Sequence, residues 1–137
     1  MPIVRPLETK DLKQVISLFS HLTSNPISFD GNALIEDYGS NCIVIEDDGV
    51  ITGFAALIIH HVPTRGKVAR IEDVVVDKDY QGRGYGKLLI NKLLEIAKNE
   101  NIKRIDLTSK PNRESARKLY ESMGFKLRDT LVFRLDL

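Results

Sequence analysis

The stretch that says most about the fold of this chain is residues 76–89, Val76-Asp77-Lys78-Asp79-Tyr80-Gln81-Gly82-Arg83-Gly84-Tyr85-Gly86-Lys87-Leu88-Leu89. The valines that end in Val76 predict a strand buried on both faces. The apolar spacing after the glycines predicts a helix to about Lys98. A strand that enters a helix through a glycine-rich loop directs unpaired N–H groups and the positive end of the helix dipole into one space. The segment therefore predicts a phosphate-binding loop.

Two common phosphate motifs do not match this loop. The nucleotide-binding P-loop requires a glycine where Gln81 stands and a serine or threonine where Leu88 stands. The dinucleotide motif has the spacing G-x-G-x-x-G, whereas Gly82, Gly84 and Gly86 are spaced G-x-G-x-G. The loop therefore indicates neither nucleotide hydrolysis nor nicotinamide dinucleotide binding.

Short apolar runs and helical patterns alternate on both sides of the loop. Asp47-Asp48-Gly49 predicts a tight hairpin, and Thr9 is the expected cap of the first helix. We expect helices over about 10–22, 33–38, 85–98 and 112–123, and strands over 3–5, 41–46, 51–59, 68–76 and 105–108, with two closing strands within 126–135. The fold class is mixed α+β, with a mostly antiparallel sheet of about six to seven strands and about four helices.

The composition indicates one globular domain over residues 1–137. The chain carries 20 Lys and Arg against 19 Asp and Glu, and 42% of its residues are hydrophobic. This balance argues against a disordered chain and against a nucleic-acid-binding arm, and no apolar run reaches the length of a membrane span. Cys42 is a lone cysteine in an apolar stretch, so we expect a buried packing residue in a reducing compartment, the cytoplasm.

The motif Q-x-x-G-x-G at Gln81–Gly86 resembles that of the GNAT superfamily of acetyl-CoA-dependent N-acetyltransferases. A second stretch of that family, A-x-x-L-Y-x-x-x-G-F, is matched by Ala116–Phe125. The resemblance implies the GNAT fold and an acetyl-CoA cosubstrate. It implies main-chain binding of the diphosphate by Gln81, Gly82, Arg83, Gly84, Tyr85, Gly86 and Lys87, and of pantetheine by Val74, Val75 and Val76. Arg83 and Lys87 either add charge at the phosphates or are solvated surface charges.

The resemblance also implies the catalytic residues. Glu72 is the expected base, unless it only pairs with Arg70 or Lys67, and in a regular strand Asp73 points to the opposite face. Tyr120 is the expected acid at the leaving sulfur, unless its ring only packs in the core. Many members have asparagine where this chain has Arg113, so either Arg113 or the adjacent Asn112 is the candidate for a cofactor contact.

The acceptor is expected to be an amine, with a small molecule favoured over a protein lysine or N-terminus. The alternatives are a protein acetyltransferase and a non-catalytic acyl-CoA-binding module. No metal is expected because His21, His60 and His61 lack ligand spacing, although His61 is a candidate border of the acceptor site. We expect no nucleic-acid or membrane partner, and a homodimer formed through the apolar edge of residues 131–135.

Overall fold

The computed structural model describes all 137 residues, which form two compact units, Met1–Leu107 and Thr108–Leu137. The first unit holds five strands, three helices and two short 3-10 turns. Their bounds are β1 Ile3–Pro6, η1 Thr9–Asp11, α1 Leu12–Phe19, α2 Gly31–Glu36, β2 Ser40–Asp47, β3 Val50–Val62, β4 Gly66–Val76, η2 Lys78–Tyr80, α3 Tyr85–Asn99 and β5 Ile105–Asp106.

The five strands form one sheet in the order β1-β2-β3-β4-β5. The first four pair antiparallel, and β5 pairs parallel with β4 after the α3 crossover. The predicted hairpin is confirmed: Asp48 and Gly49 join β2 to β3 with φ of 50° and 79°, the left-handed pair that a tight two-residue turn needs.

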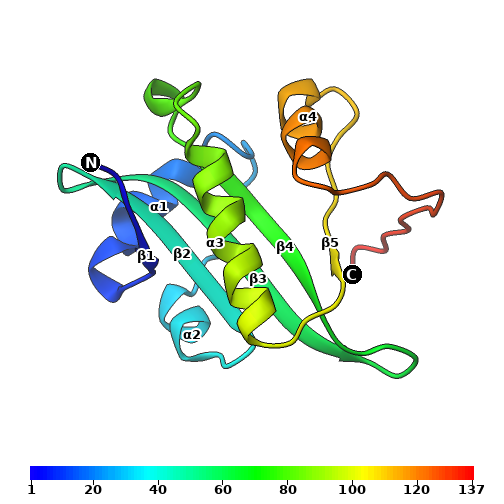
Figure 1. Cartoon of the computed structure of the whole chain (residues 1–137). Coiled ribbons are helices and arrows are strands. Elements are labelled where there is room, and N and C mark those ends of the chain that lie inside the picture. Colours follow the sequence, from blue (N-terminus) through cyan, green and yellow to red (C-terminus); the bar gives the residue numbers. More distant parts are fainter. The chain divides into compact units, whose positions relative to one another are not determined.

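Helices cover both faces of this sheet. Figure 1 shows α3 across one face and α1 and α2 on the other. α3 approaches β3 closely at Gly53, where a Cβ would lie 3.3 Å from the side chain of Leu89. On the opposite face the rings of Phe19 and Phe54 pack edge to face at 5.1 Å. The buried apolar side chains thus form a layer on each side of the sheet, which holds β4 and the loop after it in place.

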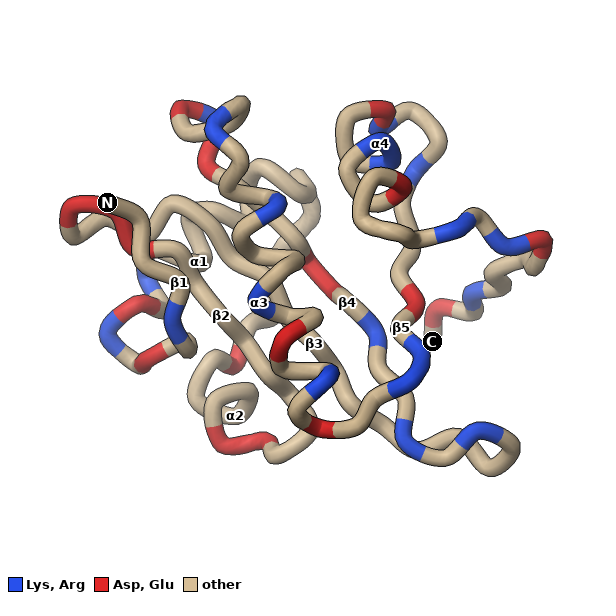
Figure 2. The backbone as a smooth tube through the Cα atoms, viewed as in Figure 1, with Lys and Arg blue, Asp and Glu red and all other residues tan.

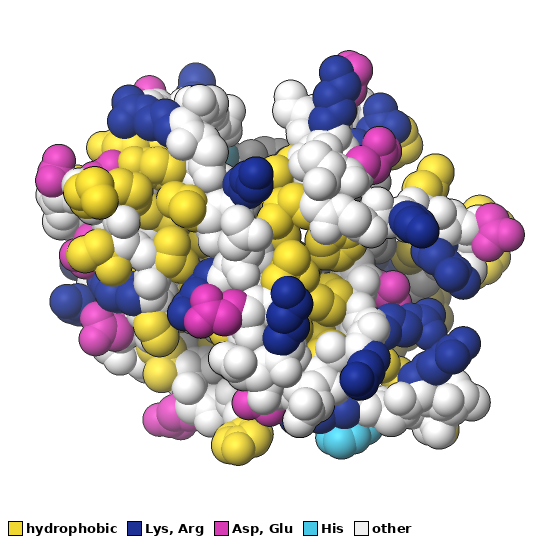
Figure 3. Space-filling view, in the orientation of Figure 1, with side chains coloured by type: hydrophobic (Ala, Val, Ile, Leu, Met, Phe, Trp, Pro, Cys, Tyr) yellow, Lys and Arg dark blue, Asp and Glu magenta, His cyan; other side chains and the backbone are white.

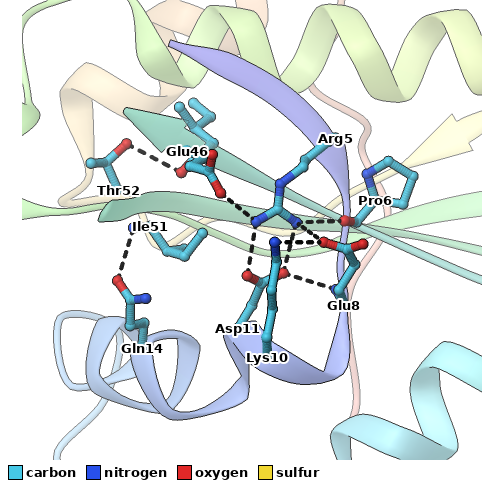
Figure 4. A network of polar contacts seen from close by, with 10 residues as sticks. Arg5, Pro6, Glu8, Lys10, Asp11, Gln14, Glu46, Ile51 and Thr52 are labelled. Atoms are coloured by element: carbon cyan, nitrogen blue, oxygen red, sulfur yellow. Dashed lines mark hydrogen bonds and ion pairs between the residues drawn. The ribbon is translucent and has the colours of Figure 1, made fainter. Parts of the chain in front are cut away.

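The start of α1 is built around a buried carboxylate that the sequence pattern did not indicate. Asp11 is 2% exposed, and its oxygens accept two hydrogen bonds from the guanidinium of Arg5 at 2.8 and 2.9 Å and one from the N–H of Glu8 at 2.8 Å (Figure 4). Glu8 is therefore the N-cap residue of η1, the turn that leads into α1. The prediction of Thr9 as the cap is wrong, because its hydroxyl instead donates to Asn32.

The second unit contains α4, Glu114–Ser122, which ends before Gly124 with φ of 97° as its sequence predicts. Residues 125–137 form no helix or strand, so the predicted closing strands are absent and the sheet has fewer strands than expected. Strand propensity alone does not make a sheet, because each strand needs a paired edge and a covered apolar face. No helix combines the length and the apolar composition that crossing a bilayer requires.

Candidate active site

The glycine-rich loop is anchored where it leaves β4. At its start, the N–H of Asp77 donates to the carbonyl of Thr52 at 2.7 Å, and the Asp77 carboxylate accepts the N–H of Asp79 at 2.9 Å. The Gln81 side-chain amide donates to the carbonyl of Val76 at 3.2 Å, which closes the loop back on the end of β4. The loop is therefore anchored to the sheet before the first glycine.

The glycines give the loop a conformation that other residues resist. Gly82 and Gly84 have φ of 81° and 83°, and Gly84 is the N-cap of α3 without any side-chain capping bond. The backbone N–H groups of residues 82–87 donate to no acceptor in the chain, and the first bond of the helix runs from Leu88 to Gly84. These free donors at the positive end of a helix dipole fit a diphosphate.

Aromatic contacts fix the direction of this helix start. The rings of Tyr80 and Tyr85 stack at 6.1 Å, and the guanidinium of Arg83 lies 4.8 Å from the centre of the Tyr80 ring. Arg83 also donates to the carbonyl of Asp79 at 3.3 Å. The Tyr85 hydroxyl donates to the carboxylate of Asp47 at the end of β2, and this bond raises the pKa of Tyr85. The loop is thus tied to the β2–β3 hairpin.

One edge of β4 has no strand beside it for much of its length. The pairing with β5 covers only Ala69 and Arg70, so the edge from Ile71 to Val76 has no neighbouring strand. The prediction of a valine run buried on both faces is wrong in part: Val75 is 5% exposed, but Val74 and Val76 are only half-buried. The open edge leads directly into the glycine-rich loop, which fits the extended arm of a cofactor whose diphosphate the loop holds.

A bulge in β4 changes the relation between Glu72 and Asp73. Phe54 pairs with Val75 and Ala56 pairs with Glu72, so three steps along β4 match two along β3, and Asp73 adopts a left-handed φ of 54°. Strict alternation therefore does not hold at Asp73. Partial desolvation by its neighbours, and then the adjacent Glu72 carboxylate, raise the pKa of Asp73, although its side chain is exposed to solvent. Asp73 was not selected from the sequence, because the regular alternation assumed there turns its side chain away from the face of Glu72, and the bulge is visible only in the structure.

Glu72 has a partner in the sheet. Its carboxylate accepts a hydrogen bond from Nε of Arg70 at 3.1 Å, one of the two ion pairs considered from the sequence. The other does not form, because Lys67 pairs with Glu100 at 2.8 Å. Glu72 and Arg70 are both partly exposed, so this pair stands at the surface of the sheet, where a ligand can reach it.

Cys42 is buried, as its apolar context predicts, and it forms no disulfide. Burial, together with the carboxylates of Asp73 and Asp37, raises the pKa of its thiol to about 11. At neutral pH the thiol is therefore protonated, and a protonated buried thiol is a poor nucleophile. This agrees with the expectation of a packing residue.

The remaining candidates lie in the second unit. Tyr120 stands on α4, where its ring packs edge to face on Phe125 at 6.0 Å. Burial raises the pKa of Tyr120, and the charge of Arg113 lowers it to a smaller extent. Arg113 is the N-cap residue of α4 and Asn112 lies in the turn before it, and neither side chain caps the helix.

Comparisons with known proteins agree with this geometry. The model of the acetyltransferase (GNAT) family matches residues 9–125. A glucosamine 6-phosphate N-acetyltransferase of Trypanosoma brucei brucei is 36% identical over 143 residues, covering 98% of this chain and 95% of that protein.

Two solved structures extend the comparison. The crystal structure of a Trypanosoma brucei acetyltransferase has a TM-score of 0.83 at 37% identity, with full coverage of both chains. The glucosamine-6-phosphate N-acetyltransferase of Arabidopsis thaliana shares the fold with a TM-score of 0.83 at 24% identity, over 98% of each chain. The family model spans most of the chain and the trypanosomal relative nearly all of it, so this protein belongs to the GNAT family and is an acetyl-CoA-dependent N-acetyltransferase.

Proposed function

We propose that this enzyme acetylates a small-molecule amine by direct attack of the amine on the donor, with both substrates bound together. The observation that carries the proposal is the open edge of β4, which leads from Glu72 and Asp73 to the free N–H groups at the start of α3. One strand thereby carries the candidate bases beside the place where a cofactor arm fits. The protonated, buried thiol of Cys42 supports direct transfer over an acyl-cysteine route.

The chain's own groups hold the donor in this proposal. Acetyl-CoA, when bound, supplies the acetyl group as an activated thioester. The main chain of residues 81–87 binds its diphosphate, and the exposed Lys87 adds charge there. Val74, Val75 and Val76 bind the pantetheine arm along the open edge of β4, and one N–H of this edge polarises the reacting carbonyl. Arg113 and Asn112 remain the candidates for a further cofactor contact.

The acceptor amine must lose a proton before it can attack. An alkyl amine with a pKa of about 10.4 is neutral in only about one molecule in 2,500 at pH 7, so a positioned base accelerates the reaction. We propose Glu72 as this base, oriented by Arg70, with Asp73 as the second carboxylate of the site. The raised pKa of Asp73 makes its carboxylate a stronger base than that of an ordinary aspartate, so Asp73 is the alternative to Glu72 in this role.

The departing thiolate needs a proton, and we propose that Tyr120 donates it. A tyrosine phenol is protonated at neutral pH, and burial raises the pKa of Tyr120 further, so the hydroxyl carries the proton that the thiolate takes up. The family model spans residues of both compact units, and this supports a single catalytic domain over residues 1–137.

Three further features belong to the proposal. The trypanosomal relative is named for glucosamine 6-phosphate, so this amino sugar is the first acceptor to assay. The exposed apolar side chains of residues 131–135 support a homodimer. A lone cysteine without a disulfide partner, Cys42, supports action in the cytoplasm.

Calorimetric titration of acetyl-CoA into the protein tests the proposal first, with coenzyme A, dephospho-coenzyme A and a Gly84→Glu variant as comparisons. We expect saturable binding of acetyl-CoA that the variant loses, because a carboxylate would stand among the free N–H donors. Release of free thiol in the presence of glucosamine 6-phosphate, but not of a peptide amine, would then support the small-molecule acceptor. A folded wild-type protein that binds no acetyl-CoA would overturn the proposal.

A further inference from the structure

The end of the β2–β3 hairpin contacts the glycine-rich loop on both sides of its first two glycines. Before them, the carbonyl of Thr52 accepts the N–H of Asp77 at 2.7 Å. After them, the hydroxyl of Tyr85, the first residue of α3, donates to the carboxylate of Asp47. Residues 82–84, which include both glycines of positive φ, lie between these contacts in the sequence. The hairpin therefore holds the two points that the loop must connect.

The hairpin end is itself held in place by other elements. The register of β2 with β3 shifts there, so Thr52 is the extra residue of a bulge and has no partner on β2. The N–H of Ile51 donates to the side chain of Gln14 at 2.9 Å, and the carboxylate of Glu46 accepts from Arg5 at 2.7 Å (Figure 4). These bonds tie the hairpin to α1 and β1, so it can support the loop rather than follow it.

The contact between Asp47 and Tyr85 is shielded from water. Tyr85 is 7% exposed, and the side chain of Asp47 is 13% exposed. Figure 2 shows acidic residues at the turn between β2 and β3, near the N-terminus, and Figure 3 shows hydrophobic side chains over the surface between this turn and α3. The amine of Met1, 3.8 Å from the same carboxylate, is fully exposed and adds little. The Tyr85 hydroxyl is therefore the main partner of Asp47.

We propose that Asp47 is a positioning residue for the donor: through the Tyr85 hydroxyl it holds the first turn of α3 where the N–H groups of the loop meet the diphosphate of acetyl-CoA. A site that is formed before binding loses less conformational freedom when the ligand arrives, and so binds it more tightly. This inference rests on the proposed function, which places the diphosphate on residues 81–87. It assigns part of the donor affinity to a carboxylate that lies outside the loop.

The negative charge of Asp47 separates a positioning role from a purely electrostatic one. A carboxylate near the loop repels a diphosphate, so its removal would tighten donor binding if only charge mattered. A positioning role predicts the opposite sign. In calorimetric titrations of the full chain we expect Asp47→Ala to weaken acetyl-CoA binding about 10-fold. Asp47→Asn should stay within about threefold of the wild type, because its amide oxygen still accepts the Tyr85 hydroxyl.

Tyr85→Phe removes the same hydrogen bond from its other side. It should weaken acetyl-CoA binding about as much as Asp47→Ala, and the double variant should bind no more weakly than either single variant, because both lose one and the same bond. The matched control is Asp48→Asn, which removes the neighbouring exposed carboxylate and keeps a residue type that tolerates its φ of 50°. This control should bind acetyl-CoA at least as tightly as the wild type.

Steady-state acetylation of glucosamine 6-phosphate gives a readout that general damage to the fold would not mimic. Asp47→Ala should raise the KM for acetyl-CoA about 10-fold with kcat unchanged, and it should leave kcat/KM for acetyl-pantetheine, which lacks the diphosphate, at the wild-type value. The inference is overturned if Asp47→Ala binds acetyl-CoA as tightly as the wild type, or if the losses of the two single variants add in the double variant. Failure of the proposed function appears in the wild-type chain instead, as absent acetyl-CoA binding or absent acetylation.

Discussion

Asp11 shows how one buried charge supports the first unit. Its carboxylate is 2% exposed and is held by Arg5, which also donates to Glu46 at 2.7 Å. We expect Asp11→Asn to lower the free energy of unfolding by about 3 kcal/mol, because it leaves the partly buried guanidinium without the carboxylate that accepts two of its hydrogen bonds. Urea unfolding measures the change. Lys10→Gln, at a side chain that is 70% exposed, is the control and should change stability by less than about 0.5 kcal/mol.

The same carboxylate predicts a pH dependence of stability. The hydrogen bond from Arg5, followed by that from the Glu8 N–H, lowers the pKa of Asp11 in the folded state. The unfolded chain therefore binds this proton first as the pH falls, so the stabilisation is present above about pH 4 and is lost as the pH falls below it. Asp11→Asn should flatten this acid limb in unfolding curves. An unchanged limb in the variant would contradict the assignment.

The roles of Glu72 and Asp73 can be distinguished by replacing each carboxylate with the corresponding amide. If Glu72 is the base, Glu72→Gln lowers kcat by about 100-fold, whereas Asp73→Asn has a smaller effect. The pH dependence of kcat/KM gives a second readout, because partial desolvation and the Glu72 carboxylate raise the pKa of Asp73 above that of an ordinary aspartate. A base role for Asp73 would instead appear as an acid limb shifted above about pH 4 that Asp73→Asn removes. That result would reassign the base.

The proposed acid role of Tyr120 is tested by removing its hydroxyl group. We expect Tyr120→Phe to lower kcat by about 100-fold and to leave the affinity for acetyl-CoA unchanged, because the ring contact with Phe125 remains while the proton donor is lost. Steady-state kinetics and calorimetry measure the two effects. Tyr38→Phe, at a residue that is 98% exposed, is the matched control. A variant with wild-type kcat would mean that the phenol only packs.

At the scale of elements, the loop between β4 and α3 depends on glycine conformation. Gly84→Ala should destabilise the fold by about 1 kcal/mol, because its φ is 83°, and should also weaken acetyl-CoA binding as the loop shifts. Gly66→Ala is the matched control: Gly66 has φ of 75°, a Cβ there also meets open space, and it lies at the other end of β4. Thermal unfolding should show similar losses for both variants, and calorimetry should show lost affinity for Gly84→Ala alone. Equal affinities would contradict the role of the loop.

Elements with strong local signals could be predicted from the sequence. The Asp48-Gly49 turn, the apolar stripe of α3 and the glycine-rich loop depend on neighbours within a few residues, so their patterns indicated them correctly. Features set by distant partners could not be predicted. Asp11 is held by Arg5, which also binds Glu46 of β2, and the bulge at Asp73 appears only in the pairing of β4 with β3.

At the scale of the whole molecule, residues 126–137 leave apolar surface uncovered. Leu131, Val132, Phe133 and Leu135 are 75–88% exposed, although their sequence favours a strand. A segment of this kind is stabilised when a second copy supplies a strand edge and an apolar face. This is the physical basis for the proposed homodimer.

Sedimentation velocity at micromolar concentration tests the dimer. We expect a dimer for the full chain and a monomer for Leu131→Asp/Phe133→Asp, because each substitution places a charge where the apolar face would be buried. Arg128→Asp, in the same exposed segment but outside the apolar stretch, is the control and should remain dimeric. Circular dichroism of the monomeric variant should retain the helix content, since α1, α3 and α4 lie outside residues 126–137. A wild-type chain that sediments only as a monomer would contradict the dimer and leave the acetyltransferase assignment intact.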